Sequence, residues 1–224
     1  MHQKKNKKIL IYFFLFLIFG TINNKKLNDI DFIGLNNISV EGLGDVNNQK
    51  LIKSLIFLKD TNLFLLNKDK IIEIIDSNSL VEKYTVFKKY PSTINIKIDE
   101  TNFLAMFKKD GNNFLLGSNG KFTLVNNDGY NVPFIFGNFK IKNFFDLEKA
   151  ISDSNFKYNE IKNLFFFKSG RWDIETKNGL LIKLPKDNIQ NSLDLAVNFL
   201  KQKDQKKIKD IDLRQQNQII LNAG

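Results

Sequence analysis

The chain has 224 residues, a formal net charge of +10 and no cysteine, and its single histidine is His2. These properties exclude a disulfide framework, cysteine nucleophiles, Ser-His triads and histidine-ligated metal sites. Only two of the 34 basic residues are arginines, and the lysines are scattered through a chain that is also rich in asparagine, isoleucine and phenylalanine. We interpret the charge as a solvated lysine-rich surface and expect no nucleic-acid partner.

An uncharged run, Ile9–Ile22, follows four closely spaced lysines at the N-terminus. At 1.5 Å per residue the run reaches about 21 Å, against a hydrocarbon core of about 30 Å, and snorkelling of Lys8 and Lys25 extends that reach. Because the lysine cluster precedes the run, we predict a cytoplasmic tail at residues 1–8 and a single transmembrane helix at residues 9–24. A cleaved signal peptide and a buried core helix are the alternatives; the exit lacks an A-x-A-like site, and no polar face interrupts the run.

The next five elements combine strand and helix patterns. Thr93–Glu100 has isoleucines at every second position, which predicts a strand with one face in a core and one in water. The two helices have apolar residues at helical spacing; Asp45 or Asn47 can cap the first, and Asn67 can cap the second. In order, the elements are a strand at 38–42, helices at 47–58 and 67–76, and strands at 81–88 and 93–100.

From Phe103 onward, short apolar runs are separated by dipeptides that favour two-residue hairpins. Two helices interrupt them, at 143–152, where Asn143 can act as the cap, and at 188–201. The turn dipeptides are Asp110-Gly111, Asn119-Gly120, Asp128-Gly129 and Asn178-Gly179. The expected strands are 104–108, 113–116, 163–168, 171–176, 180–184, 207–213 and 218–221.

This order of elements predicts an α+β chain with two domains. After a polar tether at residues 25–37, residues 38–101 form a unit in which two helices cover one face of a three-stranded sheet. Residues 102–224 form a β-rich domain with two helices. A chain of this length accommodates two such domains.

Motifs of both halves occur in a fixed order. The first half has Ile38–Gly42, Tyr90-Pro91 and Glu100, and the second has Val132–Gly137, Arg171–Ile174, Leu184-Pro185 and Ile211–Arg214. The ordered set resembles the FtsQ/DivIB family of cell-division proteins, in which a POTRA domain precedes a β domain. No long tail follows the β domain, so the chain is more similar to the FtsQ type than to the tailed DivIB type. Thr101, Phe103 and Gly117 stand where the family tends to have Arg, Pro and Asp.

The resemblance implies a single-pass protein of the bacterial inner membrane at the division septum, with a cytoplasmic N-terminus and a periplasmic C-terminus. It implies a scaffold that is not an enzyme, takes no cofactor or small-molecule substrate, and links early and late division proteins. Its partners would be coiled-coil proteins similar to FtsB and FtsL, bound by addition of a strand to the C-terminal β edge, with other division proteins bound through the POTRA domain. The expected partner-binding residues are Arg171, Arg214, Gln216, Gln218, Ile219, Ile220 and Leu221, and the expected structural residues are Gly42, Tyr90, Pro91, Glu100, Trp172 and Asp212.

The residues themselves bear on this site. Gln218–Leu221 is β-prone and lies near the end of the chain, so it is either an edge strand with unpaired backbone groups, or an internal or solvated one. Trp172 is expected in the core and Arg171 facing out, because neighbours on a strand point to opposite faces. Asp212 and Arg214 share a face and can pair with each other or with a neighbour.

Two other classes of function stay open. An enzyme that uses only carboxylates, or Ser and Lys, is not excluded, but Asp99 and Glu100 lie on opposite strand faces, and the glycines near 42–44 and 117–120 lack the spacing of nucleotide-binding loops. A POTRA-containing envelope assembly or secretion factor is the alternative function; it requires tandem POTRA units or a barrel, whereas one unit is found.

Overall fold

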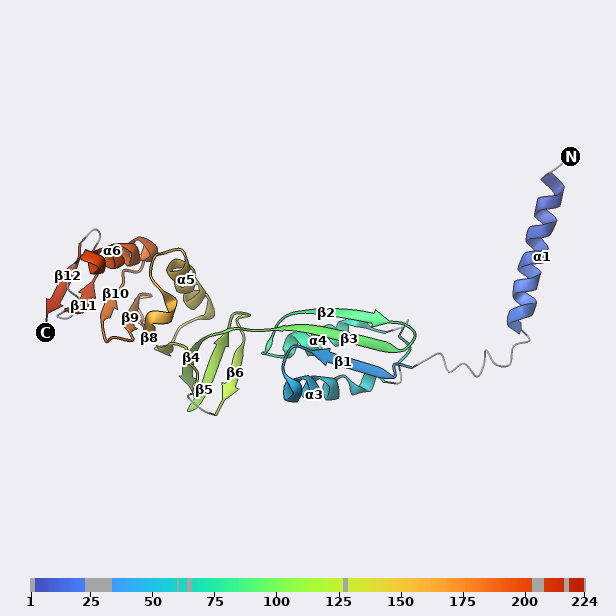
Figure 1. Ribbon diagram of the computed structural model, residues 1–224, viewed down its shortest axis with the longest axis horizontal. Coiled ribbons are helices and arrows are strands. Elements are labelled where there is room, and N and C mark those ends of the chain that lie inside the picture. Colours follow the sequence, from blue (N-terminus) through green and yellow to red (C-terminus); the bar gives the residue numbers. More distant parts are fainter. Residues whose placement is uncertain are drawn as a thin grey trace. The chain divides into compact units, whose positions relative to one another are not determined.

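The computed structural model describes residues 3–22, 34–59, 61–63, 66–126, 129–202, 208–215 and 218–223. Outside the described residues lie part of the predicted tether and Gln216. The chain divides into two compact units (Figure 1). Unit 1 comprises Met1–Asn78 and Lys83–Asp99, and unit 2 comprises Ser79–Glu82 and Glu100–Gly224.

The N-terminal run is helical, and α1 covers Gln3–Ile22. Four lysines lie in its first two turns, so that its uncharged part is Ile9–Ile22. Across the residues that the structure describes, no helix combines the length and the apolar character that crossing a membrane requires. The transmembrane helix predicted at residues 9–24 is therefore not supported.

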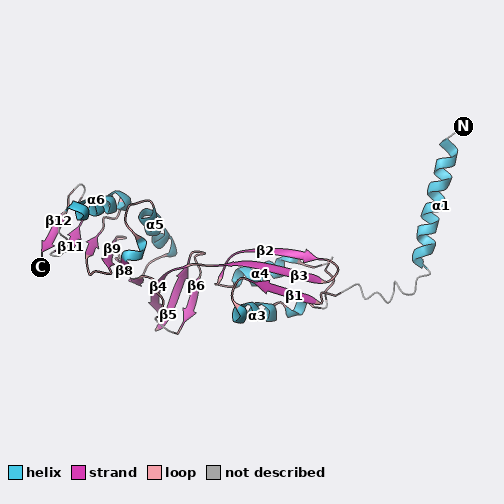
Figure 2. Ribbon diagram, viewed as in Figure 1, coloured by secondary structure: helices cyan, strands magenta, loops and turns pink. Residues whose placement is uncertain are grey.

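Unit 1 contains a three-stranded sheet with strand order β1-β3-β2, in which β1 runs parallel to β3. Figure 2 shows α3 and α4 packed along this sheet. The elements are β1 (Asn37–Glu41), α3 (Asp45–Ser54), the short 3-10 helix η1 (Ile56–Leu58), α4 (Lys68–Ser77), β2 (Val81–Lys89) and β3 (Thr93–Glu100). The predicted strand–helix–helix–strand–strand order is confirmed.

The local signals of this unit act as the sequence predicts at three points. Ile94, Ile96 and Ile98 are 0%, 1% and 6% exposed, so one face of β3 forms the core. Asn67 caps α4, because its side-chain oxygen accepts a hydrogen bond of 2.8 Å from the backbone N–H of Asp69. Gly42 has φ of 119°, and a Cβ at this position would lie 1.9 Å from the carbonyl oxygen of Ile98, so only glycine fits.

Two expectations for unit 1 are wrong in detail. The cap of α3 is Gly44, without a side-chain hydrogen bond, and neither Asp45 nor Asn47 takes that role. The tether was expected to be polar through residue 37, yet Leu35 is fully buried and its N–H donates to the carbonyl of Thr61. The sequence did not single out Leu35, because the apolar residues of this stretch follow neither a helical nor a strand period.

Unit 2 is built on a nine-stranded sheet with the order β12-β11-β10-β9-β8-β7-β4-β5-β6. Helices α5 (Ile141–Ser152) and α6 (Ile189–Gln202) make the parallel crossovers from β7 to β8 and from β10 to β11. The strands are β4 (Phe103–Lys109), β5 (Asn112–Gly117), β6 (Phe122–Val125), β7 (Phe134–Phe136), β8 (Ile161–Phe166), β9 (Trp172–Thr176), β10 (Leu181–Lys183), β11 (Ile208–Asp212) and β12 (Ile220–Ala223).

One hydrophobic core joins the two helices to the sheet. Its strand contribution includes Ile174, Ile182 and Ile211, all 0% exposed and paired across β9, β10 and β11. The helices contribute Phe144, Leu147, Ile151, Leu193 and Ala196. The opposite sheet face therefore carries the side chains that alternate with these residues.

The sequence patterns did not predict β6 and β7 as strands. Both are short, with apolar residues that lack a clean alternation, and their strand identity depends on partners far along the chain. Helix α5 also begins earlier than expected, with Lys140 as its cap residue, and the side chain of Asn143 accepts from the backbone N–H of Lys140. Asn143 therefore stabilises the start of α5 from the third helical position and is not the cap residue itself.

The segment Ser79–Glu82 is fixed within unit 2 by side-chain hydrogen bonds. The Glu82 carboxylate accepts from the hydroxyls of Thr101 at 3.0 Å and Ser118 at 2.7 Å. A Cβ at Gly117 would lie 2.7 Å from the Thr101 hydroxyl oxygen, so a side chain there would displace this threonine. Thr101 and Gly117 thus fit one another.

Candidate partner-binding edge

The strand β12 is one of the two outer strands of the nine-stranded sheet. It pairs antiparallel with β11, with Asp212 opposite Ile220 and Ile211 opposite Leu221, and no described strand lies on its other side. Ile220 is 43% exposed and Leu221 is 37% exposed, whereas Ile219 packs against the core of unit 2. The edge therefore combines backbone groups open to pairing with two accessible apolar side chains.

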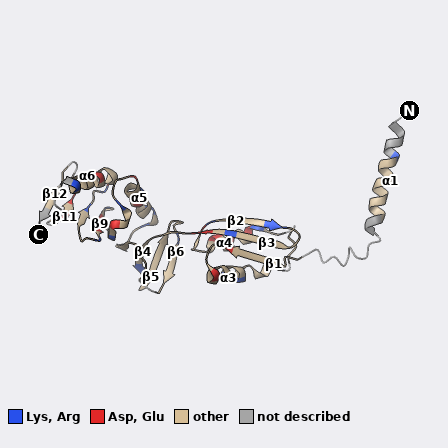
Figure 3. Ribbon diagram, viewed as in Figure 1, with Lys and Arg blue, Asp and Glu red and all other residues tan. Residues whose placement is uncertain are grey.

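A row of charged side chains leads across the sheet to this edge. In the sheet, Lys183 of β10 lies opposite Asp173 of β9 on one side and opposite Asp212 of β11 on the other. Asp212 in turn lies opposite Ile220 of β12. Because register partners point to the same face, this row lies on the face opposite the core isoleucines. Figure 3 shows acidic and basic residues in these strands. Lys183 forms an ion pair with Asp210, in which its Nζ lies 3.2 Å from a carboxylate oxygen.

Arg214 forms an ion pair with Asp212. Its Nε lies 2.8 and 2.9 Å from the two carboxylate oxygens, and its terminal nitrogen also bonds the carboxylate. These hydrogen bonds, opposed in part by burial, lower the pKa of Asp212 below its ordinary value. Of the two pairings left open by the sequence, the structure shows Asp212 with Arg214.

Arg171 lies just before β9 and stacks on Phe167, with its guanidinium carbon 4.2 Å from the ring centroid. Its Nε is 3.6 Å from a carboxylate oxygen of Asp173, within ion-pair range but too long for a hydrogen bond. Both atoms are buried without a hydrogen-bond partner. Burial raises the pKa of Asp173, and the neighbouring positive charges of Arg171, Arg214 and Lys183 oppose that rise.

The structure brings together only part of the predicted site. Arg214, Ile220 and Leu221 lie at or next to the edge, and Gln218 is exposed just before β12, whereas Gln216 lies outside the described residues. Arg171 precedes β9, which is separated from β12 by two strands. Sequence reasoning missed Asp173, although its two-residue spacing from Arg171 places both on one strand face.

The expected structural residues have different environments. Trp172 is 2% exposed and contacts the ring of Phe166, with centroids 4.7 Å apart, as expected for a core residue. Tyr90 is 58% exposed, Pro91 follows it through a cis peptide bond, and Glu100 is exposed at the end of β3.

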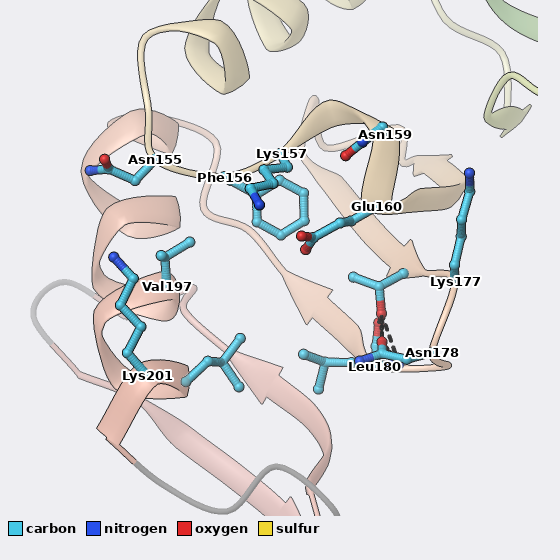
Figure 4. A pocket seen from close by; sticks show the side chains of 12 residues that line it. Asn155, Phe156, Lys157, Asn159, Glu160, Lys177, Asn178, Leu180, Val197 and Lys201 are labelled. Carbon is cyan, nitrogen blue, oxygen red and sulfur yellow. Dashed lines mark hydrogen bonds between the residues drawn. The ribbon is translucent and has the colours of Figure 1, made fainter.

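A hollow of about 580 Å³ lies elsewhere in unit 2, between α6, the 3-10 helix η2 (Tyr158–Glu160) and the β9–β10 turn. Figure 4 shows the Glu160 carboxylate and the Phe156 ring directed into it. Lys177 at its rim donates a hydrogen bond to Asn131. None of the predicted site residues lines this hollow. Within the described residues, no group of three His, Cys, Asp or Glu side chains is arranged to hold a metal ion.

The arrangement defines a class of protein, with a POTRA-like unit followed by a sheet domain that has an open terminal edge. Residues 34–101 match the family model for a POTRA domain of the FtsQ type, and residues 105–214 match the model for the C-terminal domain of cell division protein FtsQ/DivIB. The chain belongs to the FtsQ/DivIB family of cell-division proteins. The family predicted from the ordered motifs is thereby confirmed.

Relatives match most of the chain. The cell division protein FtsQ of Rickettsia bellii is 26% identical over 186 residues, which cover 82% of this chain and 70% of the relative. The cell division protein DivIB of Clostridium botulinum is 28% identical over 232 residues, which cover 92% of this chain and 86% of the relative. DivIB of Bacillus subtilis is 33% identical over 109 residues, which cover 48% of this chain and 41% of the relative.

Proposed function

We propose that this division protein is a non-enzymatic scaffold that binds coiled-coil division proteins similar to FtsB and FtsL by strand addition to β12. In this role it links early and late division proteins at the membrane of the septum. The domain boundaries that we propose are 38–101 for the POTRA domain and 102–224 for the β domain.

The observation that carries the proposal is the outer position of β12. An added strand gains main-chain hydrogen bonds along the open edge, and alternate side chains give specificity. Ile220 and Leu221 are exposed at this edge, so a bound strand buries apolar surface that the folded chain leaves accessible. The Asp212–Arg214 pair next to the edge offers both signs of charge for choosing the register of the partner.

Arg171 extends this site across the face of the sheet. Its side chain remains 28% exposed while stacked on Phe167, although its Nε is buried beside Asp173. A partner that continues from β12 over the charged row can place a carboxylate beside this guanidinium. Arginine suits this role because its planar group desolvates readily and pairs with carboxylates in two-point geometry.

The test begins with a pulldown from membranes in mild detergent, with the full-length chain as bait and mass spectrometry as the readout. The coiled-coil protein recovered is then purified and titrated against the wild-type chain, Ile220→Lys and Arg171→Glu. Each variant is expected to lose about tenfold or more in affinity while its circular dichroism spectrum is unchanged. Leu124→Lys, an equivalent change on the outer strand β6, is the matched control.

Unchanged affinity in both variants, with folding intact, would remove β12 as the binding site. Recovery of barrel proteins or secretion components in place of coiled-coil proteins would favour the envelope-assembly alternative.

A further inference from the structure

The strand β6 forms the edge of the sheet opposite to β12. Its sequence, Phe122-Thr123-Leu124-Val125, contains no charge and no proline, and Phe122, Thr123 and Val125 favour β structure. Exposed edge strands usually carry a charged residue, a proline or a bulge that discourages pairing. The β6 edge has none of these protections within its four residues, so a further strand can pair with it.

The register shows which backbone groups face outward. The N–H of Gly117 donates to the carbonyl of Lys121 at 3.0 Å, which makes these residues a hydrogen-bonded pair. Hydrogen-bonded and non-hydrogen-bonded pairs alternate along an antiparallel ladder. Thr123, two residues beyond Lys121, therefore bonds toward β5, whereas Phe122 and Leu124 direct their N–H and C=O groups away from the sheet.

The side chains of the same two residues are exposed on the face that the helices partly cover. Leu124 is 58% exposed and Phe122 is 37% exposed. Phe122 contacts Phe107 of the core, with ring centroids 4.8 Å apart, so the patch is an open continuation of the hydrophobic core. Ile141, 37% exposed at the start of α5, lies beside Gly120 and extends the patch past the turn before β6.

Basic groups flank this patch. Lys121 stands directly before β6, and Lys140 and Lys142 stand on either side of Ile141, with Lys142 paired to Asp146. The N-terminus of α5 adds a partial positive charge at the same place. The surroundings therefore favour a segment with acidic residues.

We propose that β6 binds an extended segment of a second protein, in which alternate apolar side chains pack on Phe122 and Leu124 and acidic residues flank the strand. The outward backbone groups require an extended partner. The basic groups beside β6 are complementary to an acidic segment and not to a second copy of this chain, which carries the same lysines. This site is separate from the one proposed at β12.

The probe for the test is a fluorescently labelled peptide of sequence EVTVTVE, titrated against the purified full-length chain by fluorescence anisotropy. Leu124→Pro removes an outward-facing N–H that makes no bond within the sheet, and Leu124→Lys removes the apolar contact and adds a charge. We expect saturable binding that each substitution weakens about tenfold or more, and that Ile220→Lys leaves unchanged. A peptide with lysine in place of both glutamates is expected to bind about tenfold or more weakly.

Several results would overturn the proposal. These are no binding up to about millimolar peptide, binding that survives both Leu124 substitutions, or equal binding of the lysine peptide. Sedimentation of the chain alone completes the test, since a dimer that Leu124→Pro dissociates would assign the edge to a second copy. Circular dichroism of each variant separates lost binding from lost folding, and failure at β6 leaves the β12 proposal untouched because Ile220→Lys probes that edge alone.

Discussion

The two outer strands of one sheet differ in what lies beside them. At β12, the register row runs from Asp173 through Lys183 and Asp212 to Ile220, so that charges lead up to the edge. At β6, the row from Phe107 through Phe114 to Leu124 is entirely apolar. Both strands are short and both expose apolar side chains. The charged row beside β12 lies on the sheet face away from the core, whereas the exposed apolar surface beside β6 continues the core face.

The largest expected effect comes from the core between the two edges. Trp172→Ala should lower the free energy of unfolding by about 3–5 kcal/mol, because it empties a fully enclosed aromatic site in contact with Phe166. Urea unfolding followed by circular dichroism measures this loss. Phe136→Ala, at a residue that is 44% exposed, is the control and should cost much less. A loss below about 1 kcal/mol for Trp172→Ala would mean that this side chain is not packed in the hydrophobic core of unit 2.

The charged row should respond to pH through Asp173. Burial raises the pKa of its carboxyl in the folded state, so the stability contributed by the protonated form is complete below the ordinary aspartate pKa and is lost as pH rises through the raised value. Asp173→Asn removes this dependence. The stability of the variant relative to wild type should therefore improve from pH 3 to pH 7 in urea titrations. A difference that is constant with pH would contradict the assignment.

The neighbouring pair should show the opposite dependence on pH and a smaller effect. Hydrogen bonds from Arg214 lower the pKa of Asp212, so their stabilisation is present above the ordinary aspartate pKa and is lost as pH falls through the lowered value. Arg214→Ala should cost about 0.2–1 kcal/mol at pH 7, because Arg214 is largely solvated, and nothing in strong acid. The same substitution in an Asp212→Asn background is the control, where the loss should disappear.

The smallest effects are expected at the edges themselves. Leu124→Lys and Ile220→Lys should each change the free energy of unfolding by less than about 0.5 kcal/mol, because both side chains are exposed. Thermal unfolding of the two variants beside the wild type measures this. A large loss in either one would show that the residue supports the fold, and binding data from that variant would then need a milder substitution.

Much of the fold follows from local patterns. The alternating isoleucines of β3, the Asn67 cap and the burial of Trp172 were all predicted from residue type and spacing, because each depends on groups within a few positions of the chain. The short strands β6 and β7 were not predicted, since three or four apolar residues fit several structures until a neighbour fixes one. The site was predicted in part for the same reason: the Asp212–Arg214 pair is local, whereas the row through Lys183 spans three strands.

The sequence by itself determined the order of elements in unit 1, the face of β3 that enters the core, and the motifs that identify the family. Only the tertiary structure decided which strands are outer ones, which charges share a row, and why Gly117 accompanies Thr101. The physical reason is the distance along the chain over which each interaction acts. Periodicity and capping act between residues close in the chain, whereas strand order and register are set by pairing between segments that the chain brings together only when it folds.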